Sequence, residues 1–477
     1  MIPEGGQDVR ELDDELPFED FADHPAGDLT LAEFDAWLAG QHRAQPHQVT
    51  RIPFAALDGW LFESGTGNLV HRSGQFFSIE GLDVRTDREW AGHWRQPIIV
   101  QPEVGVLGIL VKRIAGVPHM LMQAKMEPGN VNGIQLSPTV QATRSNFTGV
   151  HGGRGIPYLN HFLGPERGRV VADVLQSEQA AWYLHKRNRN MIVEVEGPVE
   201  ERDDFCWLTL QQVRKLLHRD HLVNMDTRTV LACMPPPVAS ARPGPPCAPF
   251  GALVRESMSG RRRSETSTEE LLSWLTDIRT RRQLVQRRVP LHDMAEHGWR
   301  QGPDEITHVD GKYFDVIAVH VEAGNREVQS WSQPLIAPVE QGVVALIVKE
   351  INGVLHALIQ ARLGAGAVTV AELAPTVNCQ PGNYREVPER SRPTYLDHVL
   401  TADPARIRYD VVHTEEGGRF FQARNRYLVV EAEPDFDTAP GEHFRWVSLH
   451  QLSRLARHYN YLNVELRSLM TGIHTLQ

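Results

Sequence analysis

The sequence predicts an α+β protein, with mixed α and β structure, made of two copies of one unit in tandem. The chain repeats itself at a constant offset, so that Trp94 falls on Trp331 (331 − 94 = 237). The same shift superposes Arg187-Asn188-Arg189 on Arg424-Asn425-Arg426 without a gap. Each copy opens with a helix signal, continues with strand and hairpin patterns, and closes with Leu-rich helical segments.

The opening helix of each copy is marked by a capping box. Thr30 and Glu33 form one, and Ser267 and Glu270 form the other. Apolar residues follow at helical spacing in both copies, and each set includes a tryptophan. The spacing therefore predicts amphipathic helices that begin near residues 31 and 268.

The middle of each copy has the pattern of a β-hairpin. Residues 104–111 and 118–123 are apolar runs separated by a turn at Ala115-Gly116, and the second copy has Asn352-Gly353 at that turn. A short helix is predicted over 158–163, and residues 184–195 are predicted to carry a dense Arg/Asn stretch and then a strand. Residues 208–217 and 226–231 predict the closing helices.

The repeat sets the predicted domain boundaries. An acidic tail covers 1–27, the first repeat 28–234, a Pro-rich extended linker 235–265, and the second repeat 266–477. A length of 477 residues leaves each repeat enough chain for its own core.

Composition narrows the functional class. The net charge of −11 argues against nucleic acid and anionic membranes as partners. The four cysteines make no metal-type spacing and indicate reduced thiols. The N-terminus has no signal pattern, and no apolar run is long enough to span a membrane, so we expect a cytoplasmic protein.

The Arg187-Asn188-Arg189 run is the first candidate site. On a strand, the two arginines share one face and Asn188 takes the other. Two guanidinium forks on one face suit a diphosphate, because each binds phosphate oxygens bidentately. The alternative is a pair of surface salt bridges. Because the whole tripeptide recurs in the second copy, we favour ligand contact.

A second candidate is the polar end of an apolar strand at Gln123-Ala124-Lys125, matched by Gln360-Ala361-Arg362. A strand that ends in polar groups often ends at a pocket, although charge that protects a strand edge explains it equally well. The glycine-rich segment 143–155 could bring backbone amides to an anion, but a plain flexible loop fits the same residues.

Acid–base candidates recur as well. Tyr158 and His161 could act as acid and base on one helix face, or they could be a buried tyrosine and a capping histidine. Glu178, just ahead of the Arg/Asn strand, could take a proton from carbon or pair with Arg187. The paired tryptophans, Trp94 included, are expected in the core, and one of them could stack on a base.

Five further runs indicate a resemblance to a known family. They are Leu136-Ser-Pro-Thr-Val-Gln141-Ala-Thr143, Asp173-Val-Leu-Gln-Ser-Glu178-Gln, Lys186-Arg-Asn-Arg-Asn190, and the paired ends Val223-Asn224-x-Asp226-x-Arg228 and Leu462-Asn463-x-Glu465-x-Arg467. In these runs the chain resembles the NDP-hexose 2,3-dehydratases of deoxysugar biosynthesis, from about residue 30 onward. The resemblance implies a tandem duplication of a Nudix-like domain, with a mixed β-sheet flanked by helices. The Nudix metal box is absent, because the required Gly and Glu positions hold Ala371 and Val377 and Pro388 breaks the helix.

The resemblance also implies a reaction. The substrate would be a dTDP-4-keto-6-deoxyhexose that loses its C3 proton and then its C2 hydroxyl, with no cofactor and no metal. Glu178 or His161 would be the base and Tyr158 the acid, while Lys125 or Asn146 polarises the C4 carbonyl. Arg154, Arg187 and Arg189 would hold the diphosphate. The substrate-binding candidates in full are Trp94, Gln123, Arg144, Asn146, Arg154, Arg187, Asn188, Arg189, Gln360, Arg362, Asn383, Tyr395, His398, Arg424, Asn425 and Arg426.

We expect the first repeat to be catalytic, since it keeps the glycines and Gln176-Ser177-Glu178-Gln179, whereas the second has His413-Thr414-Glu415-Glu416. The second repeat would bind nucleotide or support a homodimer, and two nucleotide-sugar sites per chain are predicted. An NAD(P)H-dependent 3-ketoreductase would take the unstable product. A non-catalytic nucleotide-sugar scaffold and a residual Nudix hydrolase are the alternatives.

Overall fold

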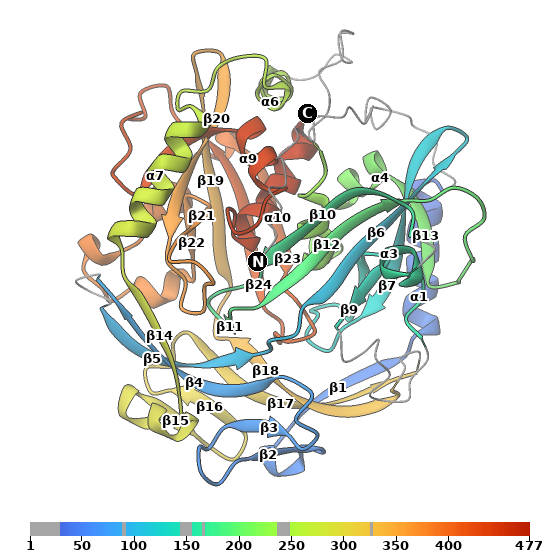
Figure 1. Ribbon diagram of the computed structural model, residues 1–477, viewed down its shortest axis with the longest axis vertical. Coiled ribbons are helices and arrows are strands. Elements are labelled where there is room, and N and C mark those ends of the chain that lie inside the picture. The colour runs from blue at the N-terminus through green and yellow to red at the C-terminus, as the bar shows by residue number, and fades with distance from the viewer. Residues whose placement is uncertain (1–28, 88–91, 144–154, 165–166, 236–248, 325–327) are drawn as a thin grey trace, which may run out of the picture.

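The computed structural model describes residues 29–87, 92–143, 155–164, 167–235, 249–324 and 328–477. It shows an α+β protein with two large mixed sheets and two smaller sheets (Figure 1). The larger pair carries most of the candidate site residues, and the smaller pair lies across one side of the larger sheets (Figure 1).

The large sheet of the first repeat has the strand order β10-β12-β6-β7-β13, with β8 on β7 and β9 on β6. Its central neighbours β12 and β6 are parallel, and its other pairs are antiparallel. The strands are β6 (Gly105–Ile114), β7 (Val117–Met126), β8 (Ile134–Ser137), β9 (Val140–Ala142), β10 (Arg169–Ser177), β12 (Arg187–Glu194) and β13 (Phe205–Thr209).

The second repeat rebuilds this sheet strand for strand. Its β24 and β19 are the parallel pair, and β23, β20, β25, β21 and β22 take the other places. The strands are β19 (Gly342–Ile351), β20 (Val354–Arg362), β21 (Glu372–Ala374), β22 (Val377–Cys379), β23 (Ile407–Thr414), β24 (Arg424–Glu431) and β25 (Phe444–Ser448).

The two smaller sheets exchange their first strands between the repeats. Strand β1 of the first repeat pairs with β17 of the second, and β14 of the second pairs with β4 of the first (Figure 1). The strands of one sheet are β1 (His47–Ile52), β15 (Trp299–Gln301), β16 (Glu305–His308), β17 (Phe314–Ala323) and β18 (Ser330–Pro338). Those of the other are β2 (Trp60–Phe62), β3 (Leu69–His71), β4 (Ser78–Thr86), β5 (His93–Val100), β11 (Tyr183–Leu184) and β14 (Leu284–Val289).

Two equivalent glycines cross the boundary between the repeats. The amide of Gly129 donates to the carbonyl of Gly417 at 2.7 Å. The amide of Gly366 donates to the carbonyl of Ala180 at 2.6 Å. A Cβ on Gly129 would overlap the carbonyl of Phe420, and one on Gly366 would overlap that of Tyr183. Only glycine lets the two backbones approach this closely.

We therefore expect Gly129→Ala and Gly366→Ala each to lower the free energy of unfolding by about 1 to 3 kcal/mol, the usual cost of overpacking. Gly65, which has open space around its Cβ position, provides the control Gly65→Ala. Urea unfolding of the three variants measures the difference. Equal stability of all three would contradict this account of the boundary.

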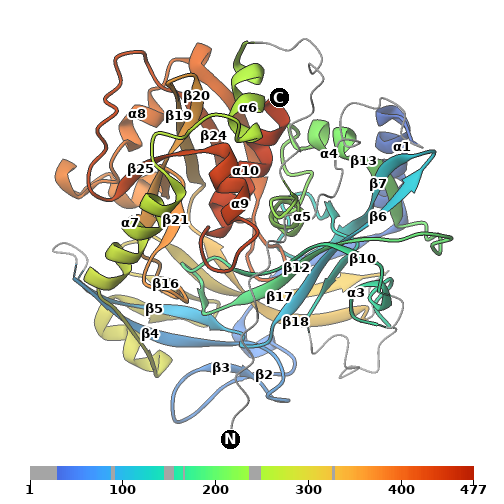
Figure 2. The same cartoon turned by 45° about the horizontal axis from the view of Figure 1, so that its top comes forward.

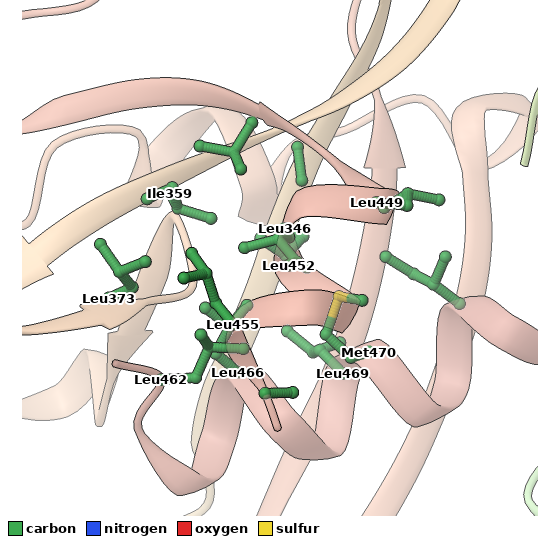
Figure 3. Close-up of a cluster of buried hydrophobic side chains, with 14 of the residues drawn as sticks. Leu346, Ile359, Leu373, Leu449, Leu452, Leu455, Leu462, Leu466, Leu469 and Met470 are labelled. Atoms are coloured by element: carbon green, nitrogen blue, oxygen red, sulfur yellow. The ribbon is translucent and has the colours of Figure 1, made fainter. Parts of the chain in front are cut away.

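Helices cover the large sheets and close the core. The second repeat uses α6 (Pro249–Ser259), α7 (Thr268–Arg281), α9 (Leu449–Leu455) and α10 (Val464–Ile473). Leu452 and Leu455 of α9 pack with Leu466 and Leu469 of α10 toward Leu346 of β19 (Figure 3). The first repeat has an equivalent core that includes α1 (Leu31–Ala44), α4 (Leu210–Leu216) and α5 (Met225–Leu231). Helices α5 and α10 lie side by side at the middle of the molecule (Figure 2).

Most local predictions are confirmed. Both capping boxes are formed, at Thr30 and Ser267. Both hairpins turn at the predicted residues, where Ala115 and Asn352 have φ of 50° and 53°. The short helix is α3 (Asn160–Leu163), and it begins after Tyr158 rather than at it.

The predicted extended linker 235–265 differs from the structure over residues 249–259. These residues form helix α6, and Val254 and Met258 are buried in the core of the second repeat. The reason is their i, i+4 spacing, which places both side chains on one helix face. In the part of the chain that the structure describes, no helix is long and apolar enough to cross a membrane.

Candidate active site

A cluster of buried acidic groups lies where the first large sheet meets the second repeat. Glu178 follows directly on β10, and its amide donates to the carbonyl of Lys186 at 3.1 Å. The side chain is buried, and its Oε1 accepts a 2.9 Å hydrogen bond from Nδ2 of Asn188. Its Oε2 has no hydrogen-bond partner among the described residues. One carboxylate oxygen is thus held and the other is unpaired.

Burial raises the pKa of Glu178 to about 7. The guanidinium of Arg467 opposes this shift, and the carboxylate of Glu416 adds to it. A carboxyl group with this pKa near neutrality can accept and release a proton at working pH, as a general base must.

Asp226 is the second buried acid of the cluster. It lies in the first turn of α5, whose N-cap Asn224 accepts a 2.8 Å hydrogen bond from the amide of Thr227. Burial and nearby carboxylates raise the pKa of Asp226 well above its usual value. Its Oδ1 has no partner in the described structure. The shift favours the protonated form of Asp226, which makes this carboxyl a candidate proton donor.

A hydrogen-bonded network that includes Asn224, the N-cap of α5, lies at the half-buried rim of the cluster. Nε2 of Gln141 donates to Oε1 of Glu127 at 2.6 Å, and Nζ of Lys125 donates to the carbonyl of Gln141 at 3.2 Å. Nδ2 of Asn224 donates to Ser137 at 3.0 Å. Lys125 and Gln141 are partly exposed, so the cluster extends from the buried acids to the surface.

The second repeat contributes residues to the same cluster through the loop between β23 and β24. Oε2 of Glu416 accepts a 2.7 Å hydrogen bond from the hydroxyl of Tyr183. Arg419 donates to Gln101 at 3.2 Å, and its guanidinium lies 4.2 Å from the centre of the Phe77 ring. The site is therefore built from both repeats.

Two fully buried arginines join the repeats at this point, one from each. Arg467 of α10 donates to the carbonyl of Ser177, the residue before Glu178, at 2.6 Å. Arg228 of α5 donates in turn to the carbonyl of Thr414, the residue before Glu415, at 3.1 Å. The backbone that carries each glutamate is thus held by the other repeat.

In the second repeat, the residue equivalent to Glu178 is Glu415, and both of its carboxylate oxygens accept hydrogen bonds. Glu415 accepts from Asn425 at 2.8 Å, from Tyr427 at 2.7 Å and from Gln179 at 3.0 Å. Four charged or hydroxyl-bearing groups of the first site also have neutral, non-hydroxyl counterparts there. Gly364 replaces Glu127, Phe420 replaces Tyr183, Ala423 replaces Lys186, and Gln179 replaces Glu416.

Comparison with known proteins finds the same two repeats. The family described as NDP-hexose 2,3-dehydratase matches residues 31–234 and again 268–473. The chain belongs to the NDP-hexose 2,3-dehydratase family. The two matched regions correspond to the two repeats.

Relatives within this dehydratase family are similar along nearly their whole length. A protein of Saccharopolyspora spinosa is 51% identical over 94% of this chain and 92% of its own. One of Amycolatopsis orientalis is 50% identical over 92% and 89%, and one of Streptomyces violaceoruber is 47% identical over 93% and 97%. All three are named dTDP-4-dehydro-6-deoxy-alpha-D-glucopyranose 2,3-dehydratase.

The structure separates the site residues that the sequence predicts. Arg187 and Arg189 share one face of β12, and the buried Asn188 takes the other, as expected. Asn188, however, is the residue that contacts Glu178. Arg189 forms two hydrogen bonds with Asp173, at 2.7 and 2.6 Å, and Arg187 donates to Tyr459. The arginines thus lie on the face away from the acidic cluster.

The same arrangement recurs in the second repeat. Arg426 forms two hydrogen bonds with Asp410, at 2.7 and 2.6 Å, Asn425 contacts Glu415, and Arg424 is exposed. The salt-bridge alternative therefore describes Arg189 and Arg426. Diphosphate binding by these arginines stays a prediction.

Tyr158 and His161 lie across the sheet from Glu178. Tyr158 and the α3 residue Phe162 pack with Met191 and Val193 of β12. Helix α5 packs against the opposite face of the sheet, where Ile192 lies. The hydroxyl of Tyr158 donates to the carbonyl of Glu200 at 2.7 Å, and burial raises the pKa of this phenol to about 12. Tyr395 packs likewise against Phe444, and His398 lies 3.6 Å from Glu433.

The remaining candidates have local partners. Gln123 donates to Asp204 at 2.9 Å, and Gln360 donates to the carbonyl of Pro375 at 2.8 Å. Trp94 donates to Gln96 at 3.0 Å, and Asn383 donates to Gln380 at 3.0 Å. Burial raises the pKa of Glu465, and the guanidinium of Arg362 opposes that shift. Arg144, Asn146 and Arg154 lie outside the described residues.

The sequence reasoning missed Glu127, Lys186, Asp226 and Glu416 as members of the site. Three of them could have been found with the repeat itself. At the equivalent positions of the other copy, Glu127, Lys186 and Glu416 are replaced by a glycine, an alanine and a glutamine. Residues that only one copy has are candidates for chemistry that only that copy performs. Asp226 lies in one of the runs that resemble the family.

Proposed function

We propose that this chain dehydrates dTDP-4-dehydro-6-deoxy-alpha-D-glucopyranose across C2 and C3, in the first-repeat cluster. The observation that carries the proposal is the pair of buried acids Glu178 and Asp226, each with one unpaired oxygen, in a chain about half identical to enzymes named for this reaction. Their pKa values, near 7 and well above the usual range, suit one base and one acid.

The reaction follows from the C4 ketone, which acidifies the proton at C3. In the proposal Glu178 takes this proton, and the electron pair moves onto the C4 oxygen as an enolate. The enolate then expels the C2 hydroxyl, which leaves as water with a proton from Asp226. The resulting enol rearranges to a 3,4-diketo-2,6-dideoxy sugar. Lys125, partly exposed beside Gln141, is proposed to stabilise the charge on the C4 oxygen.

The test is a coupled incubation with the dTDP-4-keto sugar, a 3-ketoreductase and NADPH, which traps the unstable diketone. Loss of one water and oxidation of NADPH are expected. Tight binding without turnover would indicate a nucleotide-sugar scaffold instead, and release of dTMP in the presence of Mg²⁺ would indicate a Nudix hydrolase.

Glu178 gives the proposal a pH dependence. A base must be ionised to accept a proton, so we expect kcat to rise with pH through about 7 and then level off. The charged and titratable groups around it are Arg467, Glu416, Lys186 and Asp226. Initial rates at saturating substrate, measured on both sides of pH 7, give the profile. A rate that falls with pH over this range would contradict the role of Glu178.

The finer fold assignment belongs to the same proposal. Each large sheet has a central parallel pair of strands flanked by antiparallel strands and is covered by helices. This arrangement supports the proposal that the chain contains two Nudix-like domains. A cytoplasmic location, a homodimer and a 3-ketoreductase as downstream partner stay predictions.

A further inference from the structure

We propose that Glu416, supplied by the second repeat, is a positioning residue for dehydration in the first repeat. Its carboxylate orients the hydroxyl of Tyr183 and balances the charge of Lys186 beside Glu178. The inference rests on the proposed function and assigns the second repeat a part in it.

The contact itself is well defined. Tyr183 begins β11, five residues after Glu178 (183 − 178 = 5), and its buried hydroxyl donates to Glu416 at 2.7 Å. The loop that carries Glu416 is held by two backbone hydrogen bonds directly after this residue. Gly129 donates to Gly417 at 2.7 Å, and Ile336 donates to Arg419 at 3.0 Å. The carboxylate is therefore held in place and does not sample the surface freely.

Lys186 connects the Glu416–Tyr183 pair with the proposed base Glu178. The amide of Glu178 donates to the carbonyl of Lys186 at 3.1 Å. Burial lowers the pKa of the Lys186 ammonium, and the charges of Glu416 and Glu178 oppose that shift. Its Nζ donates to the carbonyl of Glu103 at 2.6 Å. Removal of the Glu416 charge leaves Glu178 as the principal counter-charge of a buried ammonium, and the base is then less available for a proton.

The one-sided distribution of these groups indicates chemistry more than docking of the repeats. The equivalent positions on the other side of the boundary are Gln179, Phe420 and Ala423, which offer no carboxylate, hydroxyl or ammonium. The docking contacts, by contrast, occur on both sides, as Gly129 and Gly366 show. A feature needed only to join the repeats would be expected twice.

The experiment compares Glu416→Gln with Glu415→Gln, which changes the neighbouring buried carboxylate of the second repeat, in the full chain and the coupled dehydration assay. Glutamine keeps an oxygen for Tyr183 and removes the charge. We expect kcat to fall about tenfold to a hundredfold, the effect of losing one charge-assisted hydrogen bond, with KM within about threefold of wild type. Glu415→Gln, whose oxygens accept hydrogen bonds from Asn425, Tyr427 and Gln179, is expected to keep kcat within a few-fold of wild type.

A second variant removes the partner instead of the charge. Tyr183→Phe is expected to lower kcat, and the double variant is expected to be no slower than the slower single variant, because the two groups act as one unit. Wild-type kcat in Glu416→Gln, or additive losses in the double variant, would overturn the inference. If wild type dehydrates the sugar and Glu178→Gln does not, such a result leaves the proposed function intact. Absence of turnover by wild type would defeat the proposed function itself.

Discussion

Glu178→Gln is expected to lower kcat for dehydration by about 10² to 10⁴-fold, the usual contribution of a general base. Glutamine has the size of glutamate and still offers an oxygen to Asn188, which holds Oε1 at 2.9 Å. It cannot take a proton from C3 at any working pH. The loss is therefore expected in kcat, with KM close to wild type, and the coupled reductase assay measures both.

The duplication supplies a matched control for this variant. Glu415→Gln changes the equivalent residue, whose oxygens are occupied by Asn425, Tyr427 and Gln179. It is expected to keep kcat within a few-fold of wild type. The reverse outcome, an active Glu178→Gln and an inactive Glu415→Gln, would place the chemistry in the second repeat.

The second large effect concerns stability. Arg467 donates to Thr229 at 2.8 Å, to the carbonyl of Leu462 at 2.6 Å and to that of Ser177 at 2.6 Å, and it is fully buried. Arg467→Met leaves three buried acceptors without a donor, each at a cost of about 1 to 3 kcal/mol. We expect the free energy of unfolding to fall by at least about 3 kcal/mol.

Arg228→Met is expected to act similarly, because Arg228 makes the corresponding bonds to Ser468, Val223 and Thr414. The exposed Arg454 of α9 provides the control, and Arg454→Met is expected to change stability by less than about 0.5 kcal/mol. Urea unfolding followed by tryptophan fluorescence measures all three. A stability of Arg467→Met within about 0.5 kcal/mol of wild type would show that these bonds do not hold the repeats together.

Local sequence signals predicted the local structure well. Capping boxes, turn residues and the alternation along β12 depend on neighbours in the chain, and all three are confirmed. The constant offset of the repeat also predicted which elements correspond. These features follow from backbone preferences and from the period of helices and strands.

Which strands pair with one another could not be predicted from these local signals. Nothing local in residues 47–52 says that β1 pairs with β17 of the other repeat, since any edge strand with free backbone groups is a possible partner. The face of β12 that meets the site was uncertain for the same reason. Arg189 is paired with Asp173 on the neighbouring strand, and only the register of β10 with β12 brings these two residues together.

The buried acids illustrate a further limit. Burial and charges from three other segments shift the pKa of Asp226. Its equivalent in the other copy, Glu465, is offset by 239 residues and not by 237 (465 − 226 = 239). A carboxylate at the start of a helix ordinarily stabilises the helix dipole in solvent. Only its burial near carboxylates from other segments of the chain makes Asp226 a candidate acid.

The central claim is that a base in this chain takes the C3 proton of a 4-keto sugar nucleotide and that the C2 hydroxyl then leaves. The most direct measurement uses substrate deuterated at C3, followed by mass spectrometry of the product trapped by the reductase. The account predicts a product that has lost both the C2 oxygen and the C3 deuterium. Recovery of unchanged, fully labelled substrate, or loss of the C2 oxygen with the C3 deuterium retained, would contradict it.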